Sequence, residues 1–296
     1  MARTQAISLL EAAGKKGELS EIYGIVIDNV KKDTLSSALK SQLYTGNPAA
    51  GSVEFKRFVN SSDDEYGTAR AAGKGKEITA PPVTVNLDTH REIVEEIAKR
   101  DLEAFGAANI MARRAINHID AMTSALDVAF FKEAADAATA LTTTSTDPLE
   151  QLEELILTVS NVKNDFVRGV KRNMIEVVTS STFYSKIRNK LDHLPASNVD
   201  TAAESFAIFH GVKVYESIDL PDKVLALGMA HGAVAQPVVS DQYKDPEKIP
   251  LSNDFAVEMF YDFGTKALTP DLIFKLEDKA EDKAEDKAEG NGEEGE

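Results

Sequence analysis

The residues of this chain that could carry out chemistry are few, and their spacing does not assemble a site. The five histidines are His90, His118, His193, His210 and His231. No two of them have the His-x-x-x-His spacing that places two metal ligands on one helical face. The chain has no cysteine, which excludes disulfides, thiolate metal sites and thiol nucleophiles. We therefore predict no catalytic residue, no metal site and no cofactor.

The stretch Gly73-Lys74-Gly75-Lys76 has the composition of a phosphate-binding loop but not its context. A P-loop needs a strand before it, Ser or Thr after its Gly-Lys, and a helix directly after that. Here Glu77 follows, and then a segment that looks like a strand. Two interpretations remain: a solvated hairpin tip, or a tip that docks on a neighbouring copy of the chain, which we prefer.

Two other groups of polar residues predict no site either. Asp63, Asp64 and Glu65 form an acidic cluster, but they lack the Asp-x-Asp-x-Asp-Gly spacing of a calcium loop. His118 stands two positions from Asp120 on a predicted long helix, where residues two apart do not face one another. We expect His118 at the surface or at an interface.

Composition limits the class of protein. The chain has 296 residues, is 43% hydrophobic, and can bury the core of one large domain or two. Its formal net charge is −16, of which −7 comes from ten acids and three lysines in residues 277–296. Sequence-specific nucleic-acid binding is not expected, because it needs a concentration of Lys and Arg. No apolar run predicts a membrane span, and the N-terminus does not read as a secretion signal.

The Gly/Lys stretch lies in a loop that two predicted strands must position. Val53–Val59 and Pro82–Leu87 have strand character, and Val83, Val85 and Leu87 alternate with polar neighbours. About twenty residues with almost no large apolar group separate the two strands, and such long inserts are usually functional or mobile. We predict a long hairpin whose tip projects from the body.

A long amphipathic helix is predicted to follow the hairpin. Thr89-His90-Arg91-Glu92 is a capping-box pattern that would open it, and from Thr89 to Ala138 there is no proline and only one glycine, Gly106. Steps of three and four place the apolar side chains on one stripe. These are Leu102, Phe105, Ala108, Ala112, Ile116, Ile119, Met122, Leu126 and Phe130.

The ends of the chain and its second half show other patterns. Residues 1–50 contain two short amphipathic stretches, which form either an arm that packs on another molecule or a helical pair on its own domain. Asp147-Pro148 is a helix start. Strand and helix patterns then alternate, and a tight turn at His210-Gly211 is predicted to join the strands Phe206–Phe209 and Val212–Tyr215. Phe255–Phe263 reads as a largely buried strand. The Glu-Asp-Lys-Ala repeats of the tail predict disorder. That tail either recruits a basic partner or has no specific role.

The order of these elements resembles the major capsid proteins of tailed bacteriophages, whose Hong Kong ninety-seven type fold is shared with encapsulins. Three local sequences are also similar to that family: FHGVKVYES at 209–217, VLALGMAHGAVA at 224–235 and FYDFGTKALTPDLIFKL at 260–276. The resemblance implies an α+β fold with the following parts: an N-terminal arm at 1–50, an extended hairpin loop at 51–88, a spine helix and peripheral domain at 89–146, an axial α/β domain at 147–240, return strands of the peripheral domain at 241–277, and a disordered acidic tail at 278–296.

The same resemblance implies a structural rather than an enzymatic role. The chain would self-assemble, as hexamers and pentamers, into the icosahedral head shell around the double-stranded DNA of a tailed phage, in the virion capsid after assembly in the host cytoplasm. Implied partners are a portal, separate scaffolding or decoration proteins, and packaged DNA without specific contacts; no membrane is involved. Alternatives are an encapsulin-like compartment shell, a cytosolic α/β enzyme, or an extended adaptor. Candidate contacts between subunits are Lys56, Arg57, Arg70, Gly73, Lys74, Gly75 and Lys76.

Overall fold

The structure is a computed structural model that describes residues 34–42, 51–192, 207–240 and 247–278. The chain divides into two compact units, each assembled from separate stretches. The first unit contains the residues up to Phe55, Pro82–Phe130 and Val234–Lys266. The second contains Lys56–Pro81, Phe131–Ala233 and the residues from Ala267 onward. Most of the predicted arm and nearly all of the predicted acidic tail lie outside the described residues.

The first unit is built on a sheet around one long strand, β12 (Phe255–Phe263). β3 (Thr89–Ile97), β10 (Val238–Ser240) and β11 (Glu247–Lys248) each pair with β12 in antiparallel fashion. Side chains from helix α5 (Ala107–Ala137) and from the sheet form one buried cluster. Its members are Ile97, Ile119, Met122, Leu126, Val257, Met259, Tyr261 and Phe263. The predicted buried strand at Phe255–Phe263 is confirmed.

The predicted start of the long helix at Thr89 is wrong, because residues 89–97 form strand β3. Its nine residues pair with β12 from Thr89 opposite Phe263 to Ile97 opposite Phe255. A capping box is a local signal, and pairing with a strand far along the chain overrides it here, since Ile97 joins the buried cluster.

The helix begins instead at α4 (Lys99–Phe105), and α5 follows after a break at Gly106. Gly106 has a φ of +77°, which a right-handed helix cannot contain and which glycine adopts without steric cost. The 31 residues of α5 correspond to a rod of about 46 Å. A long helix was therefore predicted correctly, but it is shorter at its N-terminal end.

The described end of the N-terminal arm packs on its own unit. Helix α2 (Leu35–Leu39) is capped by Thr34, whose side chain accepts a hydrogen bond from the Ser37 amide. The amides of Leu35 and Ser36 donate to the two carboxylate oxygens of Asp127 at 3.2 and 2.9 Å. These contacts satisfy the first amides of the helix, which lack partners within it. For residues 34–42, this favours the interpretation of a segment packed on its own domain.

The second unit is built on a six-stranded sheet with the order β4-β14-β8-β5-β7-β6. Its strands are β4 (Thr139–Ala140), β5 (Ile175–Ser180), β6 (Ile208–Phe209), β7 (Val212–Ser217), β8 (Val224–Ala230) and β14 (Ile273–Glu277). β5 and β7 run parallel and are joined through α7 (Ser181–Asp192), whereas β8 runs antiparallel to both β5 and β14. The predicted alternation of strand and helix is thus present. The predicted hairpin turn at His210-Gly211 joins β6 and β7.

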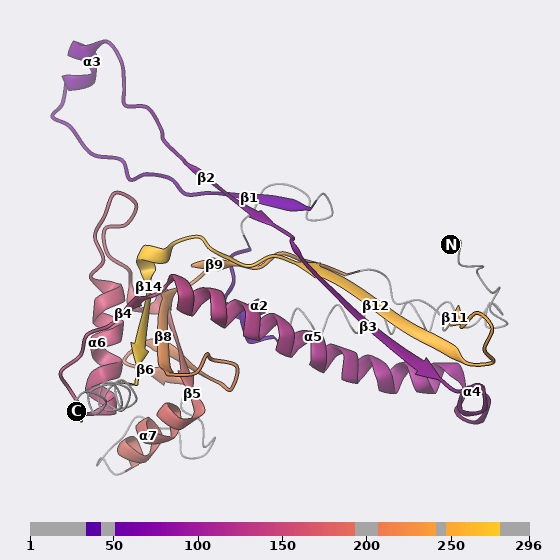
Figure 1. The fold of residues 1–296 in the computed structure, drawn as a ribbon. Helices are drawn as coiled ribbons and strands as arrows, with labels where there is room; N and C mark the ends of the chain where they lie inside the picture. The colour runs from indigo at the N-terminus through magenta and orange to yellow at the C-terminus, as the bar shows by residue number, and fades with distance from the viewer. Residues whose placement is uncertain (1–33, 43–50, 193–206, 241–246, 279–296) are drawn as a thin grey trace, which may run out of the picture. The chain divides into compact units, whose positions relative to one another are not determined.

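Two helices pack on this sheet and form its core. Helix α6 (Pro148–Ser160) starts as predicted: the Asp147 side chain accepts a hydrogen bond from the Leu149 amide, and Pro148 occupies the first turn. The helices contribute Leu152, Leu155, Ile156, Val159, Phe183 and Ile187 to the buried cluster. Figure 1 shows α6 and α7 beside these strands. Short elements complete the chain: β9 (Val234–Ala235), β13 (Lys266–Ala267) and the 3-10 turns η3 (Arg172–Met174) and η4 (Pro270–Leu272).

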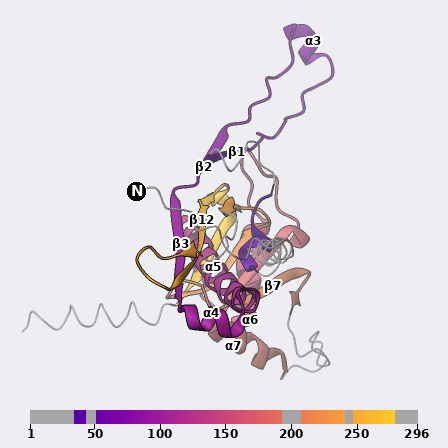
Figure 2. The same ribbon diagram turned by 90° about the vertical axis from the view of Figure 1, so that its right-hand side faces the viewer.

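The predicted hairpin is present as a long two-armed loop. β1 (Ser52–Lys56) pairs with β2 (Pro82–Asn86), and the connecting residues carry a short helix, α3 (Thr68–Ala72). Figures 1 and 2 show the two arms running out together to α3 at their far end. The predicted strands therefore exist with shorter bounds, and the tip contains one helical turn that the sequence did not predict.

Candidate functional site, the extended loop and its clamp

The extended loop, residues 57–81, is held together by contacts between its own arms. The Val59 amide donates to the Thr79 carbonyl at 3.0 Å. Farther out, the ammonium group of Lys76 donates to Ser62 Oγ at 2.6 Å and to Asp64 Oδ1 at 2.7 Å. These contacts make the loop a two-stranded projection with a defined path.

The loop exposes large apolar side chains. Tyr66 is 93% exposed, Ile78 is 81% exposed and Phe58 is 62% exposed. Single exposed apolar residues are ordinary, but three on one projecting element are a feature of surfaces that meet a partner. The loop therefore has the surface chemistry of a contact element.

An arginine anchors the base of the loop to the second unit. Arg57 forms a bidentate ion pair with Asp271, with Nη1 to Oδ1 at 2.6 Å and Nη2 to Oδ2 at 2.8 Å. Its guanidinium carbon lies 4.3 Å from the centroid of the Phe166 ring, and the side-chain amide of Asn164 also donates to Asp271. The hydrogen bond from Arg57 is the largest of the influences that hold the pKa of Asp271 below its ordinary value.

Backbone contacts extend this anchor along the loop. The Asn60 amide donates to the Asp165 carbonyl at 2.8 Å, and the guanidinium of Arg168 donates to the Ser61 carbonyl. We refer to the following eight residues as the clamp: Arg57, Asn60, Ser61, Asn164, Asp165, Phe166, Arg168 and Asp271. All of them belong to the second unit.

The structure gives the predicted contact residues different settings. Arg57 forms its ion pair with Asp271 of the same chain, and Lys76 forms its ion pair with Asp64 on the opposite arm of the loop. Lys56 ends β1 and is exposed, and Lys74 and Gly75 are exposed beyond α3. Arg70 lies on α3 and Gly73 follows that helix. Lys56 thus precedes the loop and Arg57 lies at its base, whereas Arg70, Gly73, Lys74, Gly75 and Lys76 lie in its outer part.

Sequence reasoning missed the partners in the clamp. Asp271, Asn164 and Phe166 were given no role. Asn164 and Phe166 lie on a small hairpin closed by a bridge between Lys163 and Arg168. Its only local signal is a cluster of polar residues between α6 and β5, which is typical of any loop.

The prediction for His118 is wrong, because the side chain is buried with 1% exposed. Its Nε2 lies 3.1 Å from a carboxylate oxygen of Glu95 on β3, and Arg114 of α5 also pairs with Glu95. The hydrogen bond from Arg114 is the main reason that the pKa of Glu95 is lowered. Glu95 was not expected near His118 because its segment was predicted to be helical.

The other histidines of the described chain also contact one carboxylate each. The pairs, at 2.7, 2.9 and 3.1 Å, are His90 with Asp262, His210 with Glu153, and His231 with Glu176. Within the described ranges, no group of three or more His, Asp or Glu could hold a metal ion. His193 lies outside those ranges. None of the helices that the structure describes has both the length and the apolar character needed to cross a bilayer.

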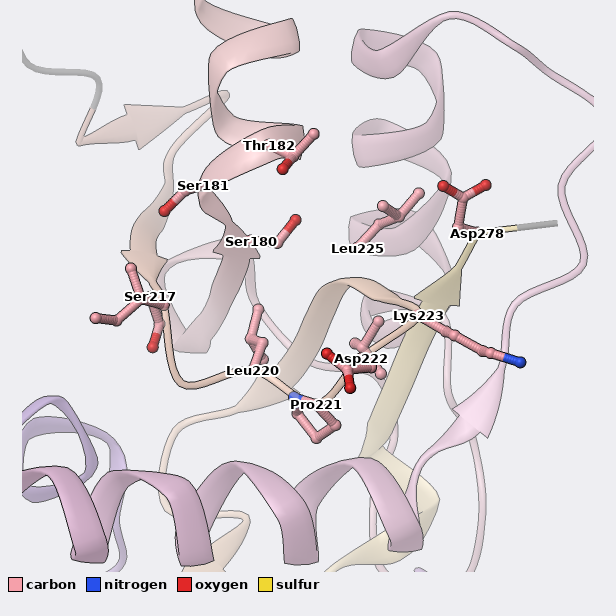
Figure 3. Close-up of a pocket in the computed structure, with 12 residues that line it drawn as sticks. Ser180, Ser181, Thr182, Ser217, Leu220, Pro221, Asp222, Lys223, Leu225 and Asp278 are labelled. Carbon is pink, nitrogen blue, oxygen red and sulfur yellow. The ribbon is translucent and has the colours of Figure 1, made fainter. Parts of the chain in front are cut away.

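A cavity of about 390 Å³ lies where β5 and β7 end, in the second unit. Hydroxyl groups of Ser180 and Ser217 line it together with the carboxylates of Asp222 and Asp278 (Figure 3). Both hydroxyls already accept local hydrogen bonds, from the amides of residues 183 and 219. The cavity therefore presents no set of groups that selects a ligand.

Known structures share this architecture. No protein-family model matches the chain, and no curated protein matches it by sequence. The fold is that of the capsid subunits of tailed phages, and solved structures of this class match most of the chain.

Three of these structures illustrate the extent of the likeness. A chain of Mycobacterium phage Che8 is 17% identical, with a TM-score of 0.56 over 80% of this chain and 93% of that one. A chain from the capsid of the cyanophage P-SCSP1u is 14% identical, with a TM-score of 0.60 over 82% and 88%. A chain of the virus-like particle from Pyrococcus furiosus is 13% identical, with a TM-score of 0.55 over 88% and 99%. At these identities the likeness defines the fold.

Proposed function

We propose that this chain is a major capsid protein, whose copies self-assemble into the icosahedral head shell around the double-stranded DNA of a tailed phage. One observation carries the proposal: the likeness to the Che8 and P-SCSP1u chains extends over 80% and 82% of this chain and over 93% and 88% of theirs. A likeness of that breadth involves the whole subunit rather than one common domain. The role is structural, and no catalytic step is part of the proposal.

The chemistry of the extended loop supports the proposal. Its exposed Phe58, Tyr66 and Ile78 would lose water-exposed apolar surface on contact with a neighbouring copy. A typical specific interface buries about 1,600 Å² in total, and a projecting two-stranded element adds area that a compact subunit lacks. We assign the contact role to the outer part of the loop, including Arg70, Gly73, Lys74, Gly75 and Lys76.

In this proposal the parts of the chain keep the roles expected of a capsid subunit. Residues 1–50 are the arm and 51–88 the extended loop. Residues 82–130 with 234–266 form the peripheral domain, and 131–233 with 267–277, which contain β14, form the axial domain, so both domains differ from their expected bounds. The subunit acts in the virion capsid, after assembly in the host cytoplasm into hexamers and pentamers. A portal, scaffolding or decoration proteins, and packaged DNA are its further partners.

Deleting the outer loop tests the proposal. We expect a variant that lacks residues 62–77, with a short Gly-Ser linker, to remain folded because the clamp and the bond between Val59 and Thr79 are retained. Its shells should fall to less than about a tenth of the wild-type yield, because neighbouring subunits lose their apolar contact. Negative-stain electron microscopy counts the shells, and far-UV circular dichroism checks the fold.

A matched control and two opposing outcomes complete this test. Truncation after Asp278 removes a similar number of residues from the end of the chain and should leave the shell yield unchanged. Wild-type shell yield from the loop deletion would contradict the role of the loop. A wild-type chain that sediments as one small, compact species would contradict the shell itself and favour a cytosolic enzyme or an adaptor.

An encapsulin-like compartment is a second candidate function. The likeness to the chain of the Pyrococcus furiosus virus-like particle, over 88% of this chain and 99% of that one, favours it. The two functions differ in what the particle contains. Particles isolated from the native source that hold double-stranded DNA of genome length support a phage head, and particles that hold folded protein cargo support a compartment.

A further inference from the structure

We propose that the clamp is an aiming joint: it sets the direction in which the extended loop leaves the second unit, and thereby the angle between neighbouring subunits. The inference rests on the proposed shell function. It assigns a positioning role to Arg57 and Asp271, which contact no neighbour in this scheme. The contact role belongs to the outer loop, and the joint determines where that outer loop arrives.

The contacts of the clamp are directional. A bidentate pair between guanidinium and carboxylate fixes two points in one plane, which a single lysine or an apolar contact cannot do. The Phe166 ring lies against the guanidinium of Arg57 and restricts the tilt of that plane. Asn164 donates to the same carboxylate and holds Asp271 in place. Together these contacts restrict the rotation of the loop base about its own axis.

The clamp acts on one short stretch of the loop. Its loop members lie between Arg57 and Ser61, and their partners all belong to the same unit. Beyond this stretch, the contacts of Lys76 with Ser62 and Asp64 join one arm to the other. The loop thus has an anchored base and an outer part that is braced across its own arms.

Lever length explains why the base angle matters. From Ser61 to the start of α3, an extended chain of seven residues spans about 25 Å. A rotation of about 10° at the base therefore displaces the tip by roughly 4 Å. That displacement equals the largest distance between heavy atoms at which two apolar side chains are still in contact. A loosened joint would let the same loop meet its neighbour at several angles, so that shells would vary in curvature.

The test compares charge removal, charge exchange and a local control. Asp271→Asn removes the ion pair with little change of size, and Arg57→Gln removes it together with the guanidinium that lies against Phe166. Arg57→Asp combined with Asp271→Arg restores the ion pair in the opposite sense. Lys163→Gln removes an exposed charge from the same hairpin outside the clamp, while the backbone bridge between Lys163 and Arg168 stays. Two quantities are measured: the distribution of particle diameters, and amide hydrogen exchange at Asn60 in dissociated subunits.

We expect Asp271→Asn and Arg57→Gln to raise exchange at the Asn60 amide about tenfold, as the loss of one charge-assisted hydrogen bond implies. Their particles should spread over several diameters or stay open, whereas the exchanged pair and Lys163→Gln should give particles of one uniform diameter. Uniform particles from Asp271→Asn would overturn the joint, whether or not exchange at Asn60 increased, and would leave the shell function standing. A wild-type chain that forms no shell would overturn both proposals.

Discussion

Arginine and carboxylate side chains connect different elements of the chain. The pairs are Arg57 with Asp271, Arg114 with Glu95, and Arg172 with Glu153. In each of them, the hydrogen bond from the arginine is the first cause of a lowered carboxyl pKa. A carboxylate with a lowered pKa stabilises the folded chain at neutral pH and loses that contribution in acid.

Gly228 is the residue at which a single methyl group should have the clearest effect. A Cβ there would lie 2.9 Å from Cγ of Leu155, a fully buried residue of α6. We expect Gly228→Ala to destabilise the second unit by about 1–3 kcal/mol, because overpacking forces a helix away from its strand. Urea unfolding of dissociated subunits, followed by circular dichroism, measures the change.

The control for this prediction is another glycine. Gly75→Ala adds the same methyl group where nothing lies within 4 Å, so its effect should stay within about 0.5 kcal/mol. Equal stability of Gly228→Ala and Gly75→Ala would show that α6 does not pack on β8 at this distance.

At the scale of elements, the sequence predicted those that local patterns specify. The alternation at Phe255–Phe263, the capped start at Asp147 and the turn at His210-Gly211 each depend on neighbouring residues, and each is present. Segment 89–97 was mispredicted because its partner β12 lies more than 150 residues farther along the chain.

The clamp was beyond sequence reasoning for a related reason. Arg57, Asn164 and Asp271 come from three stretches that no periodicity connects. Arg57 was predicted to lie in a strand and to contact a neighbouring subunit, and Asn164 and Asp271 each resemble any polar residue near a turn. The outer loop was easier, because a long insert with few apolar groups between two strands is itself a local signal. The extended loop could be predicted from the sequence, but the clamp that holds its base could not.

The contact between β3 and α5 should depend on pH. Glu95 holds Arg114 and His118 to β3, and the pKa of Glu95 lies below its ordinary value of 4.5. Its contribution is therefore complete above about pH 4.5 and is lost as the pH falls through the lowered value. We expect Glu95→Gln to cost about 1–2 kcal/mol at pH 7, and we expect that difference from the wild type to shrink below pH 4.

Unfolding of dissociated subunits at pH 7 and at pH 3.5 measures this difference. Glu96→Gln is the matched control, since Glu96 is the exposed neighbour of Glu95 on β3. A Glu95→Gln deficit that stayed constant between the two pH values would contradict the assigned role of its charge.

At the scale of the whole molecule, charge opposes assembly and apolar contact favours it. Every copy has a formal net charge of −16, so bringing copies together concentrates like charge. The screening length is about 30 Å at 10 mM salt and about 8 Å at 150 mM. At low salt, charges in neighbouring subunits therefore repel one another even when they lie far from the contact surface. At physiological salt, only charges close to that surface do so.

Salt should consequently promote shell formation. We expect the critical concentration for assembly to fall at least about threefold between 10 and 150 mM NaCl, as screening removes repulsion while apolar contacts persist. Static light scattering over a protein dilution series measures that concentration at each salt level. Truncation after Asp278 removes eight acids and three lysines, which lowers the formal net charge from −16 to −11, and should reduce the salt dependence. Assembly that weakened with added salt in both chains would mean that attraction between opposite charges, rather than apolar contact, holds the shell together.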